Sequence, residues 1–198
     1  MKYIFLTFIV FLHVSCASTN LYQQINWDAN IDIDAERYSE AKKKYLIVLE
    51  RARKAGDKEY VAIAQYGLGR ANGYLCDFDE AANWFIKSIK ERENLPDNQY
   101  AYITQNKLEL ARLYKAFGEF TLANELFEES IKRLDKIDIL NEDPIGYVLV
   151  LEDYKSSLEG VGNSTKAALV NKTIESIYSS YPGVEPKFVA KQYSEQCL

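Results

Sequence analysis

Residues 104–134 read TQNKLELARLYKAFGEFTLANELFEESIKRL. Apolar residues recur in this stretch at intervals of three and four, which is the spacing of one face of an α-helix. Gly118 interrupts the pattern, and the same spacing resumes after it. Because glycine readily adopts the left-handed backbone conformation that ends many helices, the stretch predicts two helices joined by a short turn.

The second half of this stretch contains a pattern that occurs three times in the chain. An aromatic residue, a small residue, a second aromatic residue and another small or slim residue stand at relative positions 0, 3, 7 and 10. The three sets are Tyr38, Ala41, Tyr45 and Val48; Phe78, Ala81, Phe85 and Ser88; and Phe120, Ala123, Phe127 and Ser130. These positions share one helical face, where small residues let two helices approach and the rings fill the gaps beside them. The chain therefore contains an internal repeat of helices.

The helices expected before the last two sets share a second signature, a Leu followed by a small residue, a polar or aromatic residue and a turn. Its members are Leu68-Gly69, Asn72 and Cys76, and then Leu110-Ala111, Tyr114 and Gly118. Together the two signatures resemble the tetratricopeptide repeat (TPR), in which Leu-Gly or Leu-Ala, Tyr, a turn Gly, an aromatic residue and Ala recur in this order. Residues 104–134 satisfy nearly all of that pattern, and residues 62–93 depart from it at Asn72 and Cys76.

The resemblance implies an all-α fold, namely a short right-handed TPR-like solenoid of about three to four antiparallel helical hairpins over residues 35–180. The fourth block has Ala167 at its small position but Asn171 where an aromatic residue is expected. The first block has no leading helix, so residues 35–54 are expected to act as a half-repeat or cap. The repeating small residues are 40, 42 and 44 residues apart, whereas TPRs repeat at about 34, so each unit has extra helical turns or longer connections.

The N-terminus has the features of a secretory signal peptide. Lys2 precedes an uninterrupted weakly polar stretch over residues 4–14. These eleven residues are about half of the roughly 20 that a membrane-spanning helix needs. We therefore expect residues 1–15 to be removed.

A small residue, Ser15, directly precedes Cys16, and this pair resembles the lipobox of bacterial lipoproteins. The resemblance implies that Cys16 is acylated with palmitate-type chains, and that Ala17 after it directs the protein to the periplasmic face of the outer membrane. Three alternatives remain: an ordinary secretory signal, an uncleaved anchor, and a cytosolic protein whose N-terminus is not a signal.

Residues 16–34 are expected to be the lipidated N-terminus and a linker. They are rich in Asn, Asp, Gln and Ser, with a brief alternation at Ile31 and Ile33 but no sustained period. A single strand there would have no partner in a helical chain. At the other end, residues 181–198 are expected to be a C-terminal tail.

Composition excludes several classes of function. The chain of 198 residues suits one folded unit, and its formal charge of −5 with no basic stripe argues against nucleic acid as a partner. The only histidine, His13, is lost with the signal peptide. This loss eliminates Ser-His and Cys-His nucleophile pairs and all histidine metal sites. We expect no catalytic residue, no metal and no cofactor.

Two cysteines, Cys76 and Cys197, remain once Cys16 is acylated. Two cysteines in one small domain can form a disulfide in an oxidising compartment. The tail would then have to fold back along the solenoid to reach the turn at Cys76. The alternative is a free or intermolecular thiol at the C-terminus.

The concave surface that stacked hairpins create is the candidate binding site. By the register of the family, it presents Tyr66, Arg70 and Tyr74 from one unit, and Leu108, Arg112 and Lys115 from the next. Two guanidinium groups beside aromatic rings suit an extended or helical peptide that carries an acidic group. The alternative is that both arginines pair with neighbouring Glu or Asp side chains.

These features predict a non-catalytic scaffold or assembly factor of the bacterial cell envelope that binds another envelope protein in the groove. By resemblance, TPR lipoproteins include pilotins, which help secretin rings of type IV pili to assemble, and adaptors that bring cell-wall hydrolases to their regulators. The alternatives are a small-ligand-binding periplasmic lipoprotein, and a cytosolic TPR adaptor if the N-terminus is not a signal.

Overall fold

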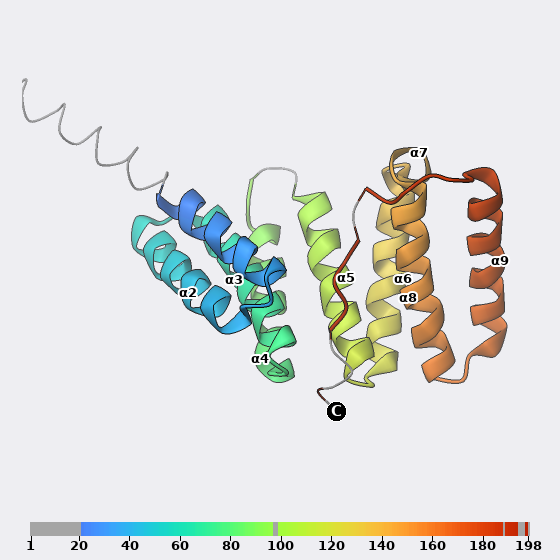
Figure 1. The fold of residues 1–198 in the computed structure, drawn as a ribbon, viewed down its shortest axis with the longest axis horizontal. Coiled ribbons are helices and arrows are strands. Elements are labelled where there is room, and N and C mark those ends of the chain that lie inside the picture. Colours follow the sequence, from blue (N-terminus) through green and yellow to red (C-terminus); the bar gives the residue numbers. More distant parts are fainter. Residues whose placement is uncertain (1–20, 97–98, 188, 194–196, 198) are drawn as a thin grey trace, which may run out of the picture.

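The computed structural model describes residues 21–96, 99–187, 189–193 and 197 (Figure 1). The predicted signal peptide, Cys16 and the first part of the predicted linker lie outside these residues. Within them every regular element is a helix, and there is no strand. The all-α prediction is therefore confirmed for the described part of the chain.

The helices form a row of antiparallel pairs. A helix over residues 21–34 pairs with α2, Tyr38–Ala55. The next pairs are α3, Lys58–Tyr74, with α4, Phe78–Glu93, and then α5, Tyr100–Ala116, with α6, Phe120–Lys136. One helical turn, α7, Ile139–Glu142, leads to the last pair, which is α8, Pro144–Gly160, with α9, Ser164–Ser180.

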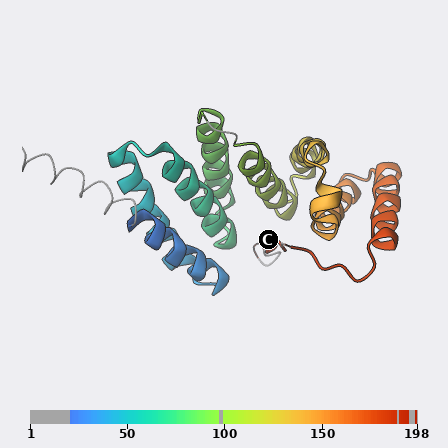
Figure 2. The same ribbon diagram turned by 90° about the horizontal axis from the view of Figure 1, so that it is seen from above.

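The row of pairs is curved, and the chain that follows α9 returns along its inner side. Figures 1 and 2 show this segment leaving α9 at one end of the row and running back to the middle. The tail expected after residue 180 is thus a non-helical segment that lies against the helical pairs. Its course determines the candidate site described below.

Residues 21–34 are helical, so the linker expected there is wrong for this part. Tyr22, Ala29 and Ile33 are buried, and their separations of seven and four residues place them on one helical face. The phenol of Tyr45 in α2 donates to Asn30 Oδ1 at 2.8 Å and joins the two helices. Of its polar residues, Gln23, Gln24 and Asp34 are exposed, whereas Asp32 is buried and pairs with Lys44 of α2 at 2.6 Å. Consequently α2 has a leading helix and is not an isolated half-repeat.

The repeated pattern of aromatic and small residues forms the interior of the row. Tyr45, Phe85 and Phe127 are at most 1% exposed. On α3, a Cβ placed at Gly67 would lie 2.4 Å from the Tyr45 ring, and one placed at Gly69 would lie 2.7 Å from the Phe85 ring. Only a residue without a side chain leaves room for these rings. Gly67 and Gly69 of α3 therefore set how closely α2 and α4 approach this helix.

The turn after α3 is closed by Cys76, whose φ of 64° lies in the left-handed region. Gly118 occupies the corresponding place after α5 with a φ of 81°. A non-glycine residue in this conformation costs roughly 1–3 kcal/mol. Cys76 therefore differs from the turn glycine of the repeat in residue type, but its backbone adopts the same left-handed conformation.

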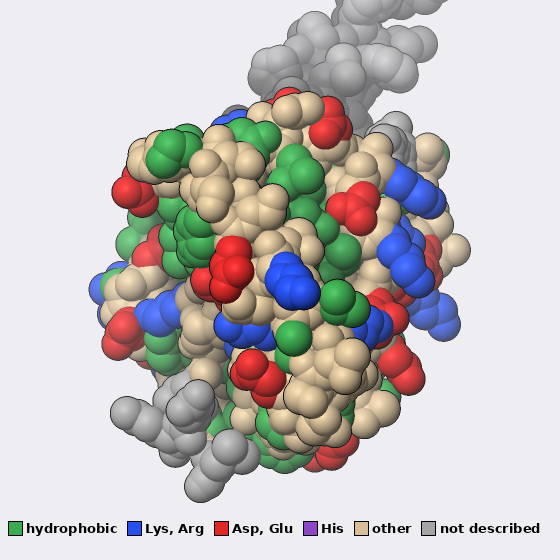
Figure 3. All heavy atoms as spheres, turned by 90° about the vertical axis from the view of Figure 1, so that its right-hand side faces the viewer, with side chains coloured by type: hydrophobic (Ala, Val, Ile, Leu, Met, Phe, Trp, Pro, Cys, Tyr) green, Lys and Arg blue, Asp and Glu red, His purple; other side chains and the backbone are tan. Residues whose placement is uncertain are grey.

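The end of the row beyond α9 is exposed. Figure 3 shows basic, acidic and hydrophobic side chains interspersed on this face, without a large region of one kind. In α9 only Ala167, Ile174 and Ile177 are buried, all toward the preceding helices. Leu169 and Tyr178 of α9 are 59% and 45% exposed, so the outer face is mixed in character and not uniformly polar.

The packing of Phe85 on Gly69 gives a first prediction. We expect Gly69→Ala to lower the free energy of unfolding by about 1–3 kcal/mol because the new methyl group overlaps the ring. Helix propensity alone would give the opposite sign, a gain of about 1 kcal/mol. Urea unfolding followed by circular dichroism measures the change. Phe85→Leu serves as the partner in a double-mutant cycle, and strictly additive effects would contradict the proposed overlap.

Candidate binding groove

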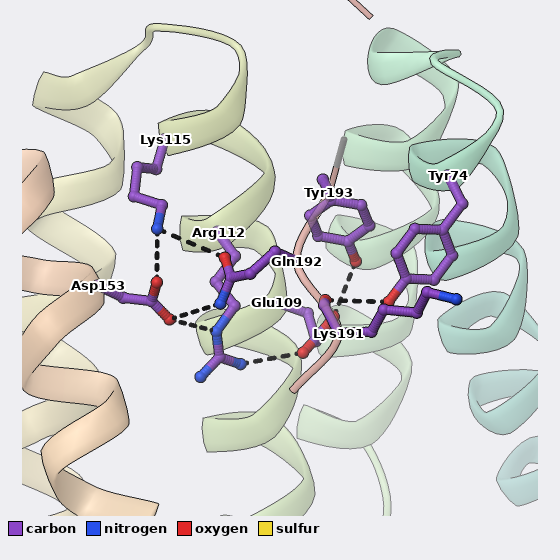
Figure 4. A network of polar contacts seen from close by, with 8 residues as sticks. All are labelled: Tyr74, Glu109, Arg112, Lys115, Asp153, Lys191, Gln192 and Tyr193. Carbon is purple, nitrogen blue, oxygen red and sulfur yellow. Dashed lines mark hydrogen bonds and ion pairs between the residues drawn. The ribbon is translucent and has the colours of Figure 1, made fainter. Parts of the chain in front are cut away.

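The inner surface of the row is occupied by the chain's own C-terminal segment. Residues 189–193 pass between Tyr74 of α3 and the polar side chains of α5 and α8 (Figure 4). We call the surface they cover the groove, which is formed by Gly73 and Tyr74 of α3, Glu109 and Leu113 of α5, and Asp153 of α8.

Tyr193 is the most deeply inserted residue of this segment, with 3% of its surface exposed. Its ring centroid lies 4.9 Å from that of Tyr74, and a Cβ at Gly73 would lie only 2.4 Å from the ring. Its hydroxyl donates to Glu109 Oε2 at 2.8 Å. Burial raises the pKa of Tyr193 well above its ordinary value, and the Glu109 carboxylate adds to the effect. The phenol therefore keeps its proton at neutral pH and remains a donor.

The two residues before Tyr193 are held by weaker contacts. The Tyr74 hydroxyl donates to the carbonyl oxygen of Lys191 at 3.1 Å, and the Lys191 ammonium pairs with Glu36 at 2.9 Å. Gln192 makes longer contacts, at 3.4 Å to the Lys115 ammonium and 3.5 Å to Asp153 Oδ2. The segment is thus recognised through one main-chain carbonyl and the side chains around it.

Four charged side chains form the floor of the groove beside Tyr193 (Figure 4). Arg112 donates from Nε to Asp153 Oδ2 at 2.7 Å and from Nη1 to Glu109 Oε1 at 3.0 Å, and Lys115 pairs with Asp153 at 2.5 Å. Glu109, Arg112 and Asp153 are each at most 6% exposed. Burial alone would lower the pKa of Arg112, but Glu109 and Asp153 raise it above its ordinary value. The floor therefore contains two compensated pairs of opposite charge.

This network decides between the two predictions made for Arg112. Its guanidinium is paired with Glu109 and Asp153, as the alternative interpretation stated, and it is not available to an acidic peptide. Lys115 is bound to the same Asp153 carboxylate. The structure gives no support to an acidic partner at these two residues, because their charge is already compensated.

Arg70 differs from Arg112. Its guanidinium carbon lies 5.9 Å from the centroid of the Tyr66 ring, and within the described residues it forms no ion pair. Burial would lower the pKa of Arg70, yet the neighbouring Tyr66 and Glu109 raise it above its ordinary value. Arg70 is thus the predicted groove cation whose charge no carboxylate in the described part of the chain directly pairs.

Two hollows adjoin the covered groove. Leu108 lines one of about 430 Å³ between α5 and α8, with apolar side chains such as Leu134 and Ile139 around it. The other has a volume of about 1260 Å³ and lies next to Tyr74, Lys115 and the residues of the tail. Tyr66 packs instead against Phe85, at 5.8 Å between ring centroids. The six predicted groove residues therefore belong to one region, but they do not form a single open surface.

The tail is also attached covalently, because the structure joins Cys76 to Cys197 in a disulfide with a Cα–Cα distance of 5.3 Å. The bond closes a loop between residues 121 positions apart. It fixes the end of the tail at the turn that follows α3, a few residues beyond Tyr193. The pairing that the sequence left open is thus present in the structure.

Three residues of this site were not predicted from the sequence, namely Glu109, Asp153 and Tyr193. Glu109 could have been found, because it precedes Arg112 by three residues and so faces the same side of a helix. Asp153 comes from another helical pair, and Tyr193 from a segment without any periodicity. Neither leaves a local signal in the sequence.

The described part of the chain contains neither a metal-binding cluster nor a membrane-spanning helix. Its His, Cys, Asp and Glu residues form no group of three or more that could hold a metal ion. Among its helices, none is both long and apolar enough to cross a membrane.

Comparison with known proteins gives a likeness of fold. No family model matches the chain, and no curated protein matches it. Among solved structures it is similar to the crystal structure of BtubC (BKLC) from P. vanneervenii, with a TM-score of 0.77 and 17% sequence identity. The match covers 88% of this chain and 69% of that chain. At this level of identity the likeness shows a shared helical architecture and nothing about function.

The charge network gives a second prediction. We expect Arg112→Met to lower the free energy of unfolding by about 3–5 kcal/mol, because Glu109 would lose its cation and Asp153 one of two. Arg53→Met on the exposed last turn of α2 is the matched control, with an expected cost under about 1 kcal/mol. Denaturant unfolding of both variants under oxidising conditions provides the comparison. Equal, small losses would show that the buried pairs are not coupled as described.

Proposed function

We propose that the chain is a TPR-type, non-catalytic scaffold or assembly factor of the bacterial cell envelope, and that it binds a partner protein in the groove. In this proposal the helical pairs are successive units of a right-handed solenoid. The pattern of aromatic and small residues in α2, α4 and α6, and the helix over 21–34 that completes the first unit, support it. The likeness to BtubC supports the architecture alone.

The observation that carries the proposal is the way in which the groove holds residues 189–193. A hydroxyl of the wall binds a main-chain carbonyl, one aromatic side chain is buried, and charged residues contact the segment on both sides. These are the means by which protein surfaces recognise extended peptides. A groove that accommodates the chain's own tail in this manner is suited to an extended segment of another protein.

The envelope location is proposed on two further grounds. The disulfide between Cys76 and Cys197 suits an oxidising compartment such as the periplasm. The lipobox-like residues before Cys16 suit anchoring to the outer membrane through acyl chains.

The lipid anchor is tested by metabolic labelling with radioactive palmitate. We expect the label to appear on the wild type and to be absent from Cys16→Ser. Labelling that persists in Cys16→Ser would exclude this anchor.

The groove is tested by immunoprecipitation from membrane extracts with mass spectrometry of the bound proteins. We expect the wild type to retain an envelope protein. Tyr193→Ala, in which the tail loses its buried ring, should retain more of it. Arg70→Glu, which reverses the charge of the predicted groove cation, should lose it. Arg53→Glu, on an exposed position of α2, is the control and should behave like the wild type. If Arg70→Glu and Tyr193→Ala both retain the wild-type proteins in equal amounts, the groove is not the binding surface.

A further inference from the structure

One residue alone holds the tail in the groove by burial. Among the described residues from 182 to 193, Tyr193 is the only buried one, whereas Val184 and Val189 are 44% and 64% exposed. The ion pairs of the tail, Lys187 with Glu142 and Lys191 with Glu36, involve partners that are 72% and 70% exposed. Ion pairs between solvent-exposed side chains contribute little to stability. The contact between tail and groove therefore depends on the Tyr193 pocket and on the disulfide.

The pocket around Tyr193 is specific for a tyrosine side chain. Gly73 provides the space, Tyr74 packs against the ring in a tilted arrangement with an interplanar angle of 32°, and Leu113 borders it. Glu109 is 3% exposed, and its Oε2 accepts the phenolic hydrogen bond. A phenylalanine in the same place would leave a buried carboxylate oxygen without this donor, which we expect to weaken binding by about tenfold or more. The pocket thus makes specific contacts with both the ring and its hydroxyl.

The surroundings also favour a basic residue two positions before the tyrosine. Lys191 reaches Glu36, and its ammonium lies 5.3 Å from the Tyr38 ring centroid and 5.8 Å from that of Tyr74. A carboxylate and two ring faces suit a cation and not an anion. Since Arg112 and Lys115 are already paired, nothing on the floor beside Tyr193 favours an acidic side chain.

We infer that the groove is a recognition site for a Lys-x-Tyr segment of a partner protein, and that the tail is a tethered competitor that occupies the site in the partner's absence. The inference rests on the proposed function and specifies the chemistry of the partner. The disulfide at Cys197, four residues beyond Tyr193, keeps the competitor close. Short tethers of this kind give effective concentrations on the order of millimolar, so a partner must bind well or the tether must be opened.

The test uses the full chain and a fluorescent peptide that copies residues 186–193, with binding measured by fluorescence polarisation. We expect saturable binding to the Tyr193→Ala chain, in which the pocket is empty, and binding at least about tenfold weaker to the disulfide-bonded wild type. Cys197→Ser, which keeps the ring but frees one end of the tail, should give an intermediate affinity. Equal affinity for all three chains would overturn the inference.

Two matched controls test the chemistry of the pocket. A peptide with Phe in place of its tyrosine should bind Tyr193→Ala about tenfold more weakly or worse, because Glu109 loses its donor. Gly73→Ala, added to Tyr193→Ala, should abolish binding while circular dichroism shows an unchanged helix content. If either change leaves the affinity unaltered, the peptide does not enter this pocket. Should Tyr193→Ala fail to fold, the comparison of Cys197→Ser with the wild type carries the test.

Two further outcomes bear on which molecule binds in the groove. If Cys197→Ser sediments as a dimer and the added Tyr193→Ala change restores the monomer, the occupant is the tail of a second copy and the assignment to a different partner is wrong. If the peptide does not bind but the immunoprecipitated protein still depends on Arg70, the proposed function stands and the Lys-x-Tyr assignment fails.

Discussion

Three aromatic rings pack onto three glycines of one helix, α3, and the arrangement of the molecule depends on these contacts. Tyr45 from the preceding pair lies on Gly67, Phe85 from the same pair lies on Gly69, and Tyr193 from the tail lies on Gly73. In each case a Cβ would come within 2.7 Å of the ring. The first two contacts set the spacing of the helices, and the third uses the same means to hold a ligand-like segment. The spacing of the helices and the covering of the groove therefore depend on the same feature, a glycine at each place where a ring must fit.

Electrostatics complement this shape. Glu109 accepts from Tyr193 and from Arg112, and Asp153 accepts from Arg112 and Lys115, so that one network joins α5, α8 and the tail. Such buried networks contribute specificity when every member is satisfied, and they cost stability when one is removed. In this network Arg112 and Lys115, the basic groups that an acidic peptide would need, are already paired with Glu109 and Asp153. It leaves Glu109 and Glu36 as acceptors for a hydroxyl and an ammonium.

Much of the fold followed from the sequence because the helical signal is local and repeated. The aromatic and small residues of the pattern lie in the interior of the row, and the turn at Gly118 is where the spacing indicated. The helix over 21–34 was missed because its apolar face is narrow and the alternation of Ile31 and Ile33 obscured it; Ile33 is buried while Ile31 is 44% exposed. A few buried residues at helical spacing outweigh a polar composition once a neighbouring face is available to cover them.

The groove was predicted only in part, for a different reason. Register along α3 and α5 correctly placed Tyr74 and Arg112 in one region, but their partners come from elsewhere in the chain. Asp153 is 41 residues from Arg112, and Tyr193 is 84 residues from Glu109. The segment that contains Tyr193 has no hydrophobic periodicity, so no local sequence pattern predicts that it covers the site. Long-range contacts of this kind depend on how the helical pairs are stacked and not on the pattern within any one of them.

The measurement that tests the covered groove most directly is a non-reducing tryptic digest of the native protein, with free thiols blocked beforehand, followed by mass spectrometry. We expect one linked species that joins residues 71–87, which contain Cys76, to residues 192–198, which contain Cys197. Recovery of both peptides with blocked thiols, or of Cys197 linked to a different chain, would contradict this expectation. In that case the tail would not be fixed beside α3, and the groove would have to be regarded as open.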